Sequence, residues 1–159
     1  MSFTRWLTVL PAVVCCLRGG DLKAASQPSP PPYGQQVVAA VLMGEAWGEG
    51  VDAMTAVAEV IRRRADLKGI SPLAVVVQPK QFTCLNRCSP EDLIRRFQGE
   101  PDFQKALRIA RRLYNHPASL PGHSRGATHF ERVGTRAHWT RGHRPVARVG
   151  QLAFYRITE

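Results

Sequence analysis

The sequence has few acidic residues and no apolar run long enough to cross a membrane. Lys and Arg number 22 against 12 Asp and Glu, a formal net charge of +10 at pH 7. Such a charge favours polyanionic surroundings, and nucleic acid, anionic lipid and the carboxylates of wall peptides all qualify. The apolar run at residues 6–17 is shorter than the roughly 20 helical residues that span a bilayer, and is typical of a secretory signal. We predict a signal peptide over residues 1–25, export to the periplasm or cell envelope, and no stable membrane anchor after cleavage.

Cysteine is scarce, and the common metal and nucleotide motifs are missing. Only Cys84 and Cys88 follow the predicted signal. Because they lie four apart in a loop of an exported protein, we predict a disulfide between them, with free thiols or half a metal site as the open alternatives. The sequence contains no His-Glu-x-x-His helix and no glycine-rich phosphate loop. We therefore predict no metal and no cofactor.

Proline separates the N-terminal region from a helical body. Four prolines within residues 26–34 exclude helix and central strand, so this segment is predicted to be an extended linker to one domain at 35–159. Within that domain, apolar spacing and capping residues predict helices at 35–46, 52–67, 89–98 and 101–116, followed by β-rich runs at 127–132 and 149–157. The predicted fold class is α+β, a mostly helical body with a small antiparallel sheet.

The segment 44–50, Gly-Glu-Ala-Trp-Gly-Glu-Gly, places a carboxylate at the end of an apolar helical stripe. Val38 and Val41 precede Glu45 with helical spacing, so Glu45 is expected to point where Val38 points. A carboxylate on a core-facing stripe loses hydration, which favours the protonated form that a general acid needs at neutral pH. Such a group is what a glycosidase requires, and a structural hydrogen-bond partner is the alternative reading.

Four blocks in order resemble the catalytic domain of the SleB/CwlJ family of cell-wall hydrolases, the spore-cortex-lytic enzyme type. They are Gly-Glu-Ala-Trp-Gly-Glu at 44–49, Gln-Pro-Lys-Gln-Phe-Thr-Cys at 78–84, Gly-Ala-Thr-His-Phe at 126–130, and Trp139-Thr140 with Val149-Gly150 and Phe154-Tyr155. The resemblance implies a lysozyme-like catalytic domain at 35–159 that acts on peptidoglycan. It also implies that the first glutamate of the glycine-flanked motif, Glu45, is the catalytic acid.

Of the two ways to cleave a glycan strand, hydrolysis and lytic transglycosylation, the second needs only one catalytic glutamate. Hydrolysing glycosidases usually use two carboxylates, and Glu49 is the nearest second candidate, with Asp52 and Glu131 as further options. A lytic transglycosylase needs only one, because the 6-hydroxyl of the sugar attacks the anomeric carbon. The resemblance favours that outcome, so we predict cleavage at N-acetylmuramic acid by Glu45 alone, with Glu49 orienting substrate or holding structure.

Aromatic and polar residues of the other blocks are candidates for substrate binding. Trp47, Phe82 and Trp139 are able to stack on the apolar faces of sugar rings, although each is also an ordinary core residue. Thr128 and His129 are neighbours in a predicted strand, so only one of them is expected to line a given cleft. Peptidoglycan is the predicted partner.

Two other classes of function remain open from the sequence. An N-acetylmuramoyl-L-alanine amidase, zinc-dependent or zinc-independent, would act on the same polymer at another bond. A non-catalytic module would bind the wall or nucleic acid through arginine-rich segments such as 132–148. The arginines are scattered and no nucleic-acid motif occurs, so we predict no nucleic-acid partner.

Overall fold

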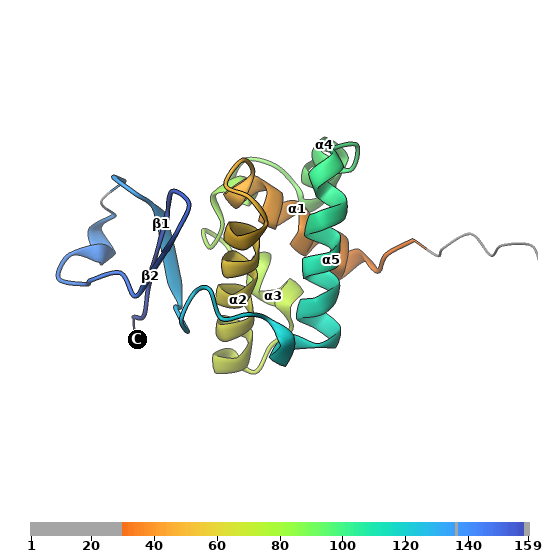
Figure 1. The fold of residues 1–159 in the computed structure, drawn as a ribbon. Coiled ribbons are helices and arrows are strands. Elements are labelled where there is room, and N and C mark those ends of the chain that lie inside the picture. Colours follow the sequence, from red (N-terminus) through yellow and green to blue (C-terminus); the bar gives the residue numbers. More distant parts are fainter. Residues whose placement is uncertain (1–29, 136, 158–159) are drawn as a thin grey trace, which may run out of the picture.

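The computed structural model describes residues 30–135 and 137–157, and its helices precede its strands (Figure 1). The helices are α1 (Tyr33–Ala46), α2 (Val51–Lys68), α3 (Pro72–Val76), α4 (Pro90–Phe97) and α5 (Pro101–Asn115). The strands are β1 (His129–Arg132), β2 (Ala147–Val149) and β3 (Leu152–Tyr155), and the short 3-10 turns are η1 (Thr83–Asn86), η2 (Pro117–Ser119) and η3 (His138–Thr140). The predicted α+β class is confirmed. The predicted signal peptide, 1–25, and the linker residues 26–29 lie outside the described residues.

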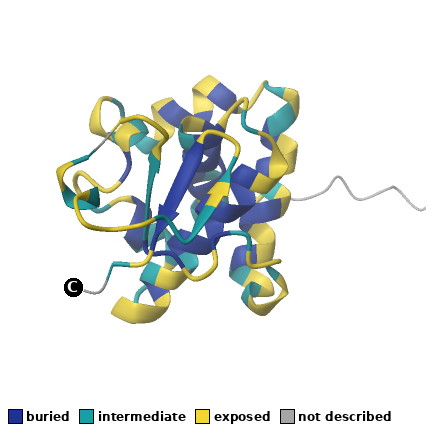
Figure 2. Cartoon of the chain, turned by 60° about the vertical axis from the view of Figure 1, so that its left-hand side comes forward, coloured by how far each residue is buried: buried dark blue, intermediate teal, exposed yellow. Residues whose placement is uncertain are grey.

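Helix α1 is the centre of the body. Every residue from 37 to 43 is fully buried, and the helix contacts α2, α3, α4 and α5 (Figure 2). A helix that is apolar all round is stable only when other elements surround it. The periodicity of α1 therefore does not define a single core-facing stripe. Among the described helices, none is long and apolar enough to span a membrane.

Local signals fix most helix ends where the sequence predicts them. The hydroxyl of Ser71 accepts the backbone N–H of Ala74, and that of Ser89 accepts the N–H of Asp92, so both serines are N-caps. Gly69, with φ 63°, ends α2 in the left-handed conformation that glycine adopts without strain. By contrast, α1 begins at Tyr33, inside the predicted linker, directly after the last proline.

The sheet has the order β1-β3-β2, and both pairs are antiparallel. The predicted run at 149–157 contains a turn at Gly150 and Gln151, which divides it between the two strands of a hairpin. All four residues of β3 are buried, and α2 contacts both β1 and β2. The sheet therefore covers one side of the helical body, and the C-terminal end of α1 lies where the two meet.

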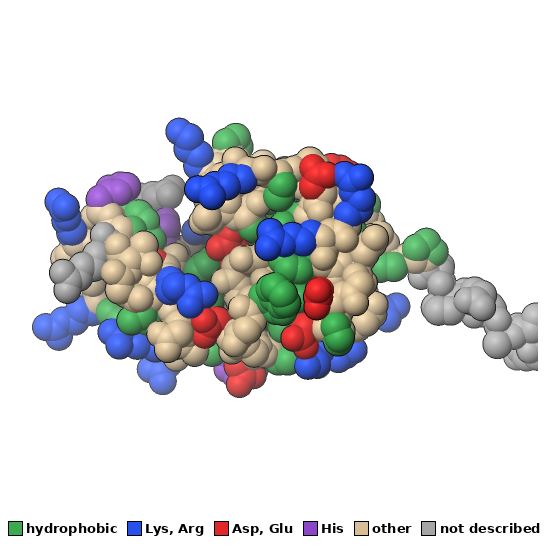
Figure 3. Space-filling model, turned by 90° about the horizontal axis from the view of Figure 1, so that it is seen from above, with side chains coloured by type: hydrophobic (Ala, Val, Ile, Leu, Met, Phe, Trp, Pro, Cys, Tyr) green, Lys and Arg blue, Asp and Glu red, His purple; other side chains and the backbone are tan. Residues whose placement is uncertain are grey.

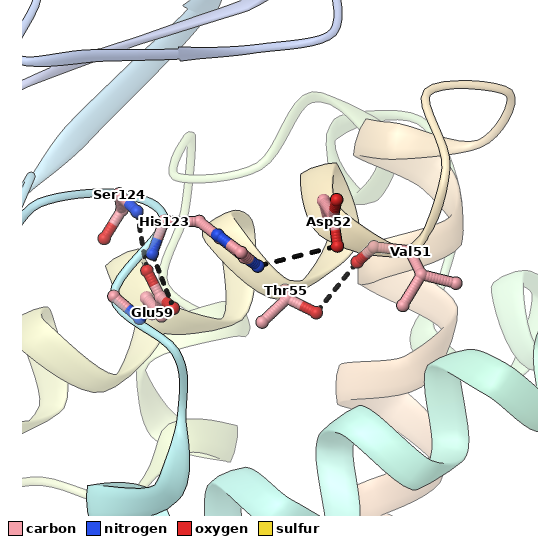
Figure 4. Close-up of polar contacts among 7 residues, drawn as sticks. Val51, Asp52, Thr55, Glu59, His123 and Ser124 are labelled. Carbon is pink, nitrogen blue, oxygen red and sulfur yellow. Dashed lines mark hydrogen bonds and ion pairs between the residues drawn. The ribbon is translucent and has the colours of Figure 1, made fainter.

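A buried glutamate fastens the segment that leads into the sheet. Glu59 of α2 is 8% exposed, and its carboxylate accepts backbone N–H groups from Gly122, His123 and Ser124 at 2.7, 3.1 and 2.6 Å (Figure 4). The ring of His123 also lies 3.5 Å from Asp52, the second residue of the same helix (Figure 4). Buried carboxylates are stable where such donors replace water. Residues 122–124 are thereby held on α2.

Candidate active site

A cleft of about 580 Å³ lies between the helical body and the sheet. Its walls come from segments far apart in the chain: Glu45 from α1, Arg64 from α2, Gln81 and Thr83 from the loop after α3, Glu131 from β1 and Trp139 from η3. The cleft thus draws on all four sequence blocks, which contribute Glu45, Gln81, His129 and Trp139 in turn.

Glu45 stands on the helical wall of this cleft and is half-buried. Glu45 follows the fully buried Val38 by two helical turns, yet it is half-buried at the cleft and not enclosed in the core, because α1 is buried up to Met43 and emerges at Gly44. The carboxylate is held from one side, since the backbone N–H of Cys84 donates to Oε1 at 3.0 Å. A half-buried carboxylate with a fixed orientation at a cleft wall suits an acid that must reach a bound sugar.

Gly44 explains why the first two blocks meet. A Cβ atom built on Gly44 would lie 2.6 Å from Cβ of Cys84, closer than real side chains approach. Only glycine at this position lets η1 pack directly on α1. That close approach brings the N–H of Cys84 within reach of Glu45.

The disulfide predicted between Cys84 and Cys88 is absent, and both cysteines are free thiols. They lie on either side of the end of η1, and the Cys88 thiol donates to the Cys84 carbonyl oxygen at 3.0 Å instead. Burial, together with the negative charge of Glu45, raises the pKa of the Cys84 thiol above its usual range. Cys84 therefore stays protonated beside the carboxylate.

Glu49, the second glutamate of the motif, does not line the cleft. Its carboxylate accepts the N–H of Gln151 at 2.8 Å and lies 2.9 Å from Nη1 of Arg132. The Gln151 hydrogen bond, reinforced by Arg132, lowers the pKa of Glu49 below its ordinary value. Glu49 thus joins the turn after α1 to the β2–β3 hairpin.

Glu131 is the carboxylate that shares the cleft with Glu45. One of its oxygens accepts the Tyr155 hydroxyl at 3.0 Å, and the other accepts the N–H of Ala137 at 2.9 Å. Burial, and then the bond to Glu131, raises the pKa of Tyr155. Glu131 is therefore held in place by two donors on the sheet side, opposite the helical wall that carries Glu45.

Only one of the three predicted stacking residues faces the cleft. Trp139 lines it, with its ring centroid 5.3 Å from that of His129 and 5.5 Å from that of Tyr155. Trp47 is half-exposed outside the cleft and packs edge-on against Phe97 of α4 at 5.7 Å. Phe82 is 2% exposed in the core, so its predicted contact with a sugar is a wrong assignment.

The expectation that Thr128 and His129 point apart is wrong, because Oγ1 of Thr128 lies 3.0 Å from Nδ1 of His129 and both residues line a second, neighbouring pocket. His129 lines the cleft, whereas Thr128 does not. The Thr128 hydroxyl donates to the carbonyl oxygen of Ile157 at 2.9 Å and accepts its N–H at 3.0 Å. Thr128 therefore fastens the segment after β3.

Arg64 is a residue of the cleft that the sequence reasoning missed. Its Nε donates to the carbonyl oxygen of Thr128 at 2.6 Å, its Nη1 donates to Gln81 at 3.1 Å, and its guanidinium lies over the Phe82 ring. Arg64 continues the apolar positions of Val57 and Ile61 with helical spacing. The sequence signal for Arg64 is a cation at the end of a stripe of buried apolar residues, where another apolar residue is expected.

Charge does not single out one face of the protein. In the view from above, Lys and Arg side chains project from both the sheet end and the helical body, and the acidic side chains lie mainly over the helical body (Figure 3). No group of three or more His, Cys, Asp or Glu that could hold a metal ion occurs among residues 30–135 and 137–157.

Comparison with known proteins assigns this chain to a family. The model of the Cell Wall Hydrolase family matches residues 48–155, more than half of the chain. The match includes Glu49, Glu131 and Trp139 but begins after Glu45, so the assignment of Glu45 depends on its geometry. No curated protein and no solved structure matches the chain. The chain belongs to the Cell Wall Hydrolase family, the SleB/CwlJ type that its sequence blocks resemble, and is a hydrolase of peptidoglycan.

Proposed function

We propose that this hydrolase cleaves the glycan strand of peptidoglycan at N-acetylmuramic acid, as a lytic transglycosylase in which Glu45 is both acid and base. The observation that carries the proposal is the place of Glu45 on the wall of a cleft of about 580 Å³, with its carboxylate oriented by the N–H of Cys84. Glu49, the other glutamate of the motif, is bonded to Arg132 and Gln151 outside that cleft.

In the first step, protonated Glu45 gives its proton to the glycosidic oxygen. The bond from that oxygen to the anomeric carbon breaks, and positive charge develops on the sugar ring next to the new carboxylate. In the second step, the carboxylate takes the proton of the sugar's own 6-hydroxyl while that oxygen bonds to the anomeric carbon. A 1,6-anhydro ring forms, and Glu45 ends protonated as it began. The internal hydroxyl has a high effective concentration, which replaces part of what a second catalytic group would supply.

The sheet wall supplies binding groups for this reaction. Trp139 offers an aromatic surface beside His129, and a sugar ring packs its apolar face on such a surface. His129 adds a polar ring that is able to bond a hydroxyl or N-acetyl group. In this arrangement the helical wall carries the acid and the sheet wall orients the sugar.

Glu131 supports a second candidate, hydrolysis with two carboxylates, because it lines the same cleft as Glu45. In that mechanism Glu131 would activate a water molecule or stabilise the sugar cation. The fixed position of Glu131 between Tyr155 and Ala137 suits either role. The two candidates differ in product: transglycosylation leaves an anhydro end, and hydrolysis leaves a reducing end heavier by one water.

Mass analysis of fragments released from purified peptidoglycan tests the proposal. Anhydro-muramic ends from the parent enzyme are the expected result. Reducing ends, lost in Glu131→Gln, would replace the proposal with two-carboxylate hydrolysis. Free peptide stems would instead show amidase action.

The substrate lies outside the cytoplasmic membrane, so the proposed function requires export. We propose residues 1–25 as the signal, 26–34 as a linker and 35–159 as the catalytic domain. N-terminal sequencing of the protein recovered from the cell envelope tests this division. A mature chain that still begins at Met1 would overturn it.

A further inference from the structure

A second pocket, of about 310 Å³, adjoins the catalytic cleft. The two cavities share the lining residues Arg64, Gln81 and His129, so they are neighbours. The second cavity lies where the last turns of α2 meet the segment that follows β3. We name it the basic pocket for its four cationic lining residues, Arg63, Arg64, Lys68 and Arg156.

Three cations of the basic pocket, Arg63, Lys68 and Arg156, have no acidic partner among residues 30–135 and 137–157. No Asp or Glu of the described residues lines the pocket. Lys68 and Arg156 are oriented by neutral acceptors, the side-chain oxygen of Gln78 at 3.0 Å and the carbonyl oxygen of Arg125 at 2.7 Å. Cations gathered without counter-charge attract an anionic ligand.

We propose that the basic pocket binds the acidic peptide stem of the peptidoglycan strand whose sugars occupy the cleft. This inference rests on the proposed function, because the stem is covalently attached to the muramic acid ring that the enzyme cleaves. Two or three extended residues span about 7–10 Å, enough to cross a wall one side chain thick. Stem carboxylates would then meet Arg63 and Lys68.

The remaining lining residues suit a short peptide. Leu67 and Ile157 offer apolar surface to small side chains, and Gln81 and Thr128 are polar side chains at the same pocket. A phosphate polymer would also satisfy the cations, but it favours a charged groove that follows its backbone. A small cavity that continues a sugar cleft favours a branch of the sugar strand.

The double variant Arg63→Gln/Lys68→Gln tests the proposal without touching the catalytic cleft, because neither residue lines it. Arg108→Gln/Arg111→Gln is the matched control, since it removes two exposed arginines of α5 that line neither cavity. Each protein is assayed on glycan strands that carry stems and on strands whose stems have been removed. The test variant is expected to raise KM about 5- to 10-fold on stem-bearing strands only, with kcat unchanged, as for two solvent-exposed charge contacts. An equal change on both substrates, or no change relative to the control, overturns the proposal.

A binding measurement separates this inference from the proposed function. Fluorescently labelled stem tetrapeptide is titrated against the parent and both double variants, and no catalysis is required. Weaker binding in Arg63→Gln/Lys68→Gln alone supports the basic pocket even for a chain that leaves the glycan uncut. A parent that cleaves glycan but does not bind the peptide overturns the pocket and leaves the catalytic proposal standing. The stem-binding proposal is also overturned if Arg63→Gln/Lys68→Gln binds the stem peptide as the parent does but loses binding to an oligonucleotide.

Discussion

The helical wall of the cleft is enclosed by other helices, whereas the sheet wall packs on the helical core through Leu152 and Phe154 and is also joined to it by a few polar contacts. On the helical side, α1 is surrounded by four helices and carries Glu45 at its end. On the sheet side, Glu49, Glu59 and Arg64 bond to the hairpin turn, to residues 122–124 and to Thr128. Glu45 therefore lies on a wall enclosed by helices, and the opposite wall is held by apolar packing together with long-range side-chain hydrogen bonds.

The largest effect should come from the acid on the helical wall. Glu45→Gln keeps the shape of the side chain and removes the proton donor, so wall-clearing activity should fall about 10²–10⁴-fold because positioned acid catalysis contributes that much. The melting temperature should stay close to that of the parent. Glu100→Gln, which removes a glutamate outside the cleft, should leave activity intact. Activity of Glu45→Gln within threefold of the parent would remove Glu45 from the mechanism.

The next effect tests the close packing behind that acid. Gly44→Ala would force apart α1 and η1, because its Cβ would lie 2.6 Å from that of Cys84. We expect a loss of about 1–3 kcal/mol in the free energy of unfolding and a fall of more than 10-fold in kcat, since the N–H donor to Glu45 moves. Gly99→Ala is the control, because nothing lies within 4 Å of a Cβ at that position. If the two variants have the same free energy of unfolding in urea and the same kcat, the close contact between Gly44 and Cys84 is not required for stability or for catalysis.

A buried link on the sheet side should affect stability more than chemistry. In Glu59→Gln an NH2 group replaces one carboxylate oxygen, so at least one of the three N–H groups of residues 122–124 loses its acceptor. The free energy of unfolding should fall by about 1–3 kcal/mol in urea titrations. Asp66→Asn on the same helix breaks only an exposed pair with Arg62 and should cost less than about 1 kcal/mol. If the two variants lose equal stability, the link to residues 122–124 is not what holds the sheet.

The smallest effect concerns Glu49 and depends on pH. The pKa of Glu49 is lowered below its ordinary value of 4.5 by the Gln151 N–H and by Arg132, so the ionised form stabilises the folded state. That contribution is complete above 4.5 and is lost as the pH falls through the lower folded value. The melting temperature of the parent should therefore exceed that of Glu49→Gln at about pH 6, and the difference between the two temperatures should narrow toward pH 3. A gap that is independent of pH would contradict this role, and an activity loss as large as that of Glu45→Gln would make Glu49 catalytic.

Local structure was predictable from the sequence because its causes are local. The N-caps Ser71 and Ser89 and the end of α2 at Gly69 each depend on a hydrogen bond or dihedral angle within a few residues. The family likeness also came from short blocks, and the family match bears it out.

The composition of the cleft was not predictable, because its partners are far apart in sequence. The face of Glu45 could not be read from α1, since apolar residues surround that helix. Nothing near Glu131 indicates that Tyr155 and Ala137 would hold it in the cleft. The disulfide predicted between Cys84 and Cys88 depends on their spacing in the sequence and not on their packing. Cys84 packs on Gly44, which lies about forty residues away in another element.

The contact between Glu49 and Gln151 joins residues 102 positions apart, and this has a consequence for synthesis. Chains emerge from the ribosome with the N-terminal part first, so the segment that bears Glu45 is synthesised long before the strand that completes the opposite wall. Contacts of such long range form late, because closing a long loop costs entropy before any bond is gained. A nascent chain therefore carries Glu45 before the cleft exists, and the cleft is complete only when the final hairpin pairs.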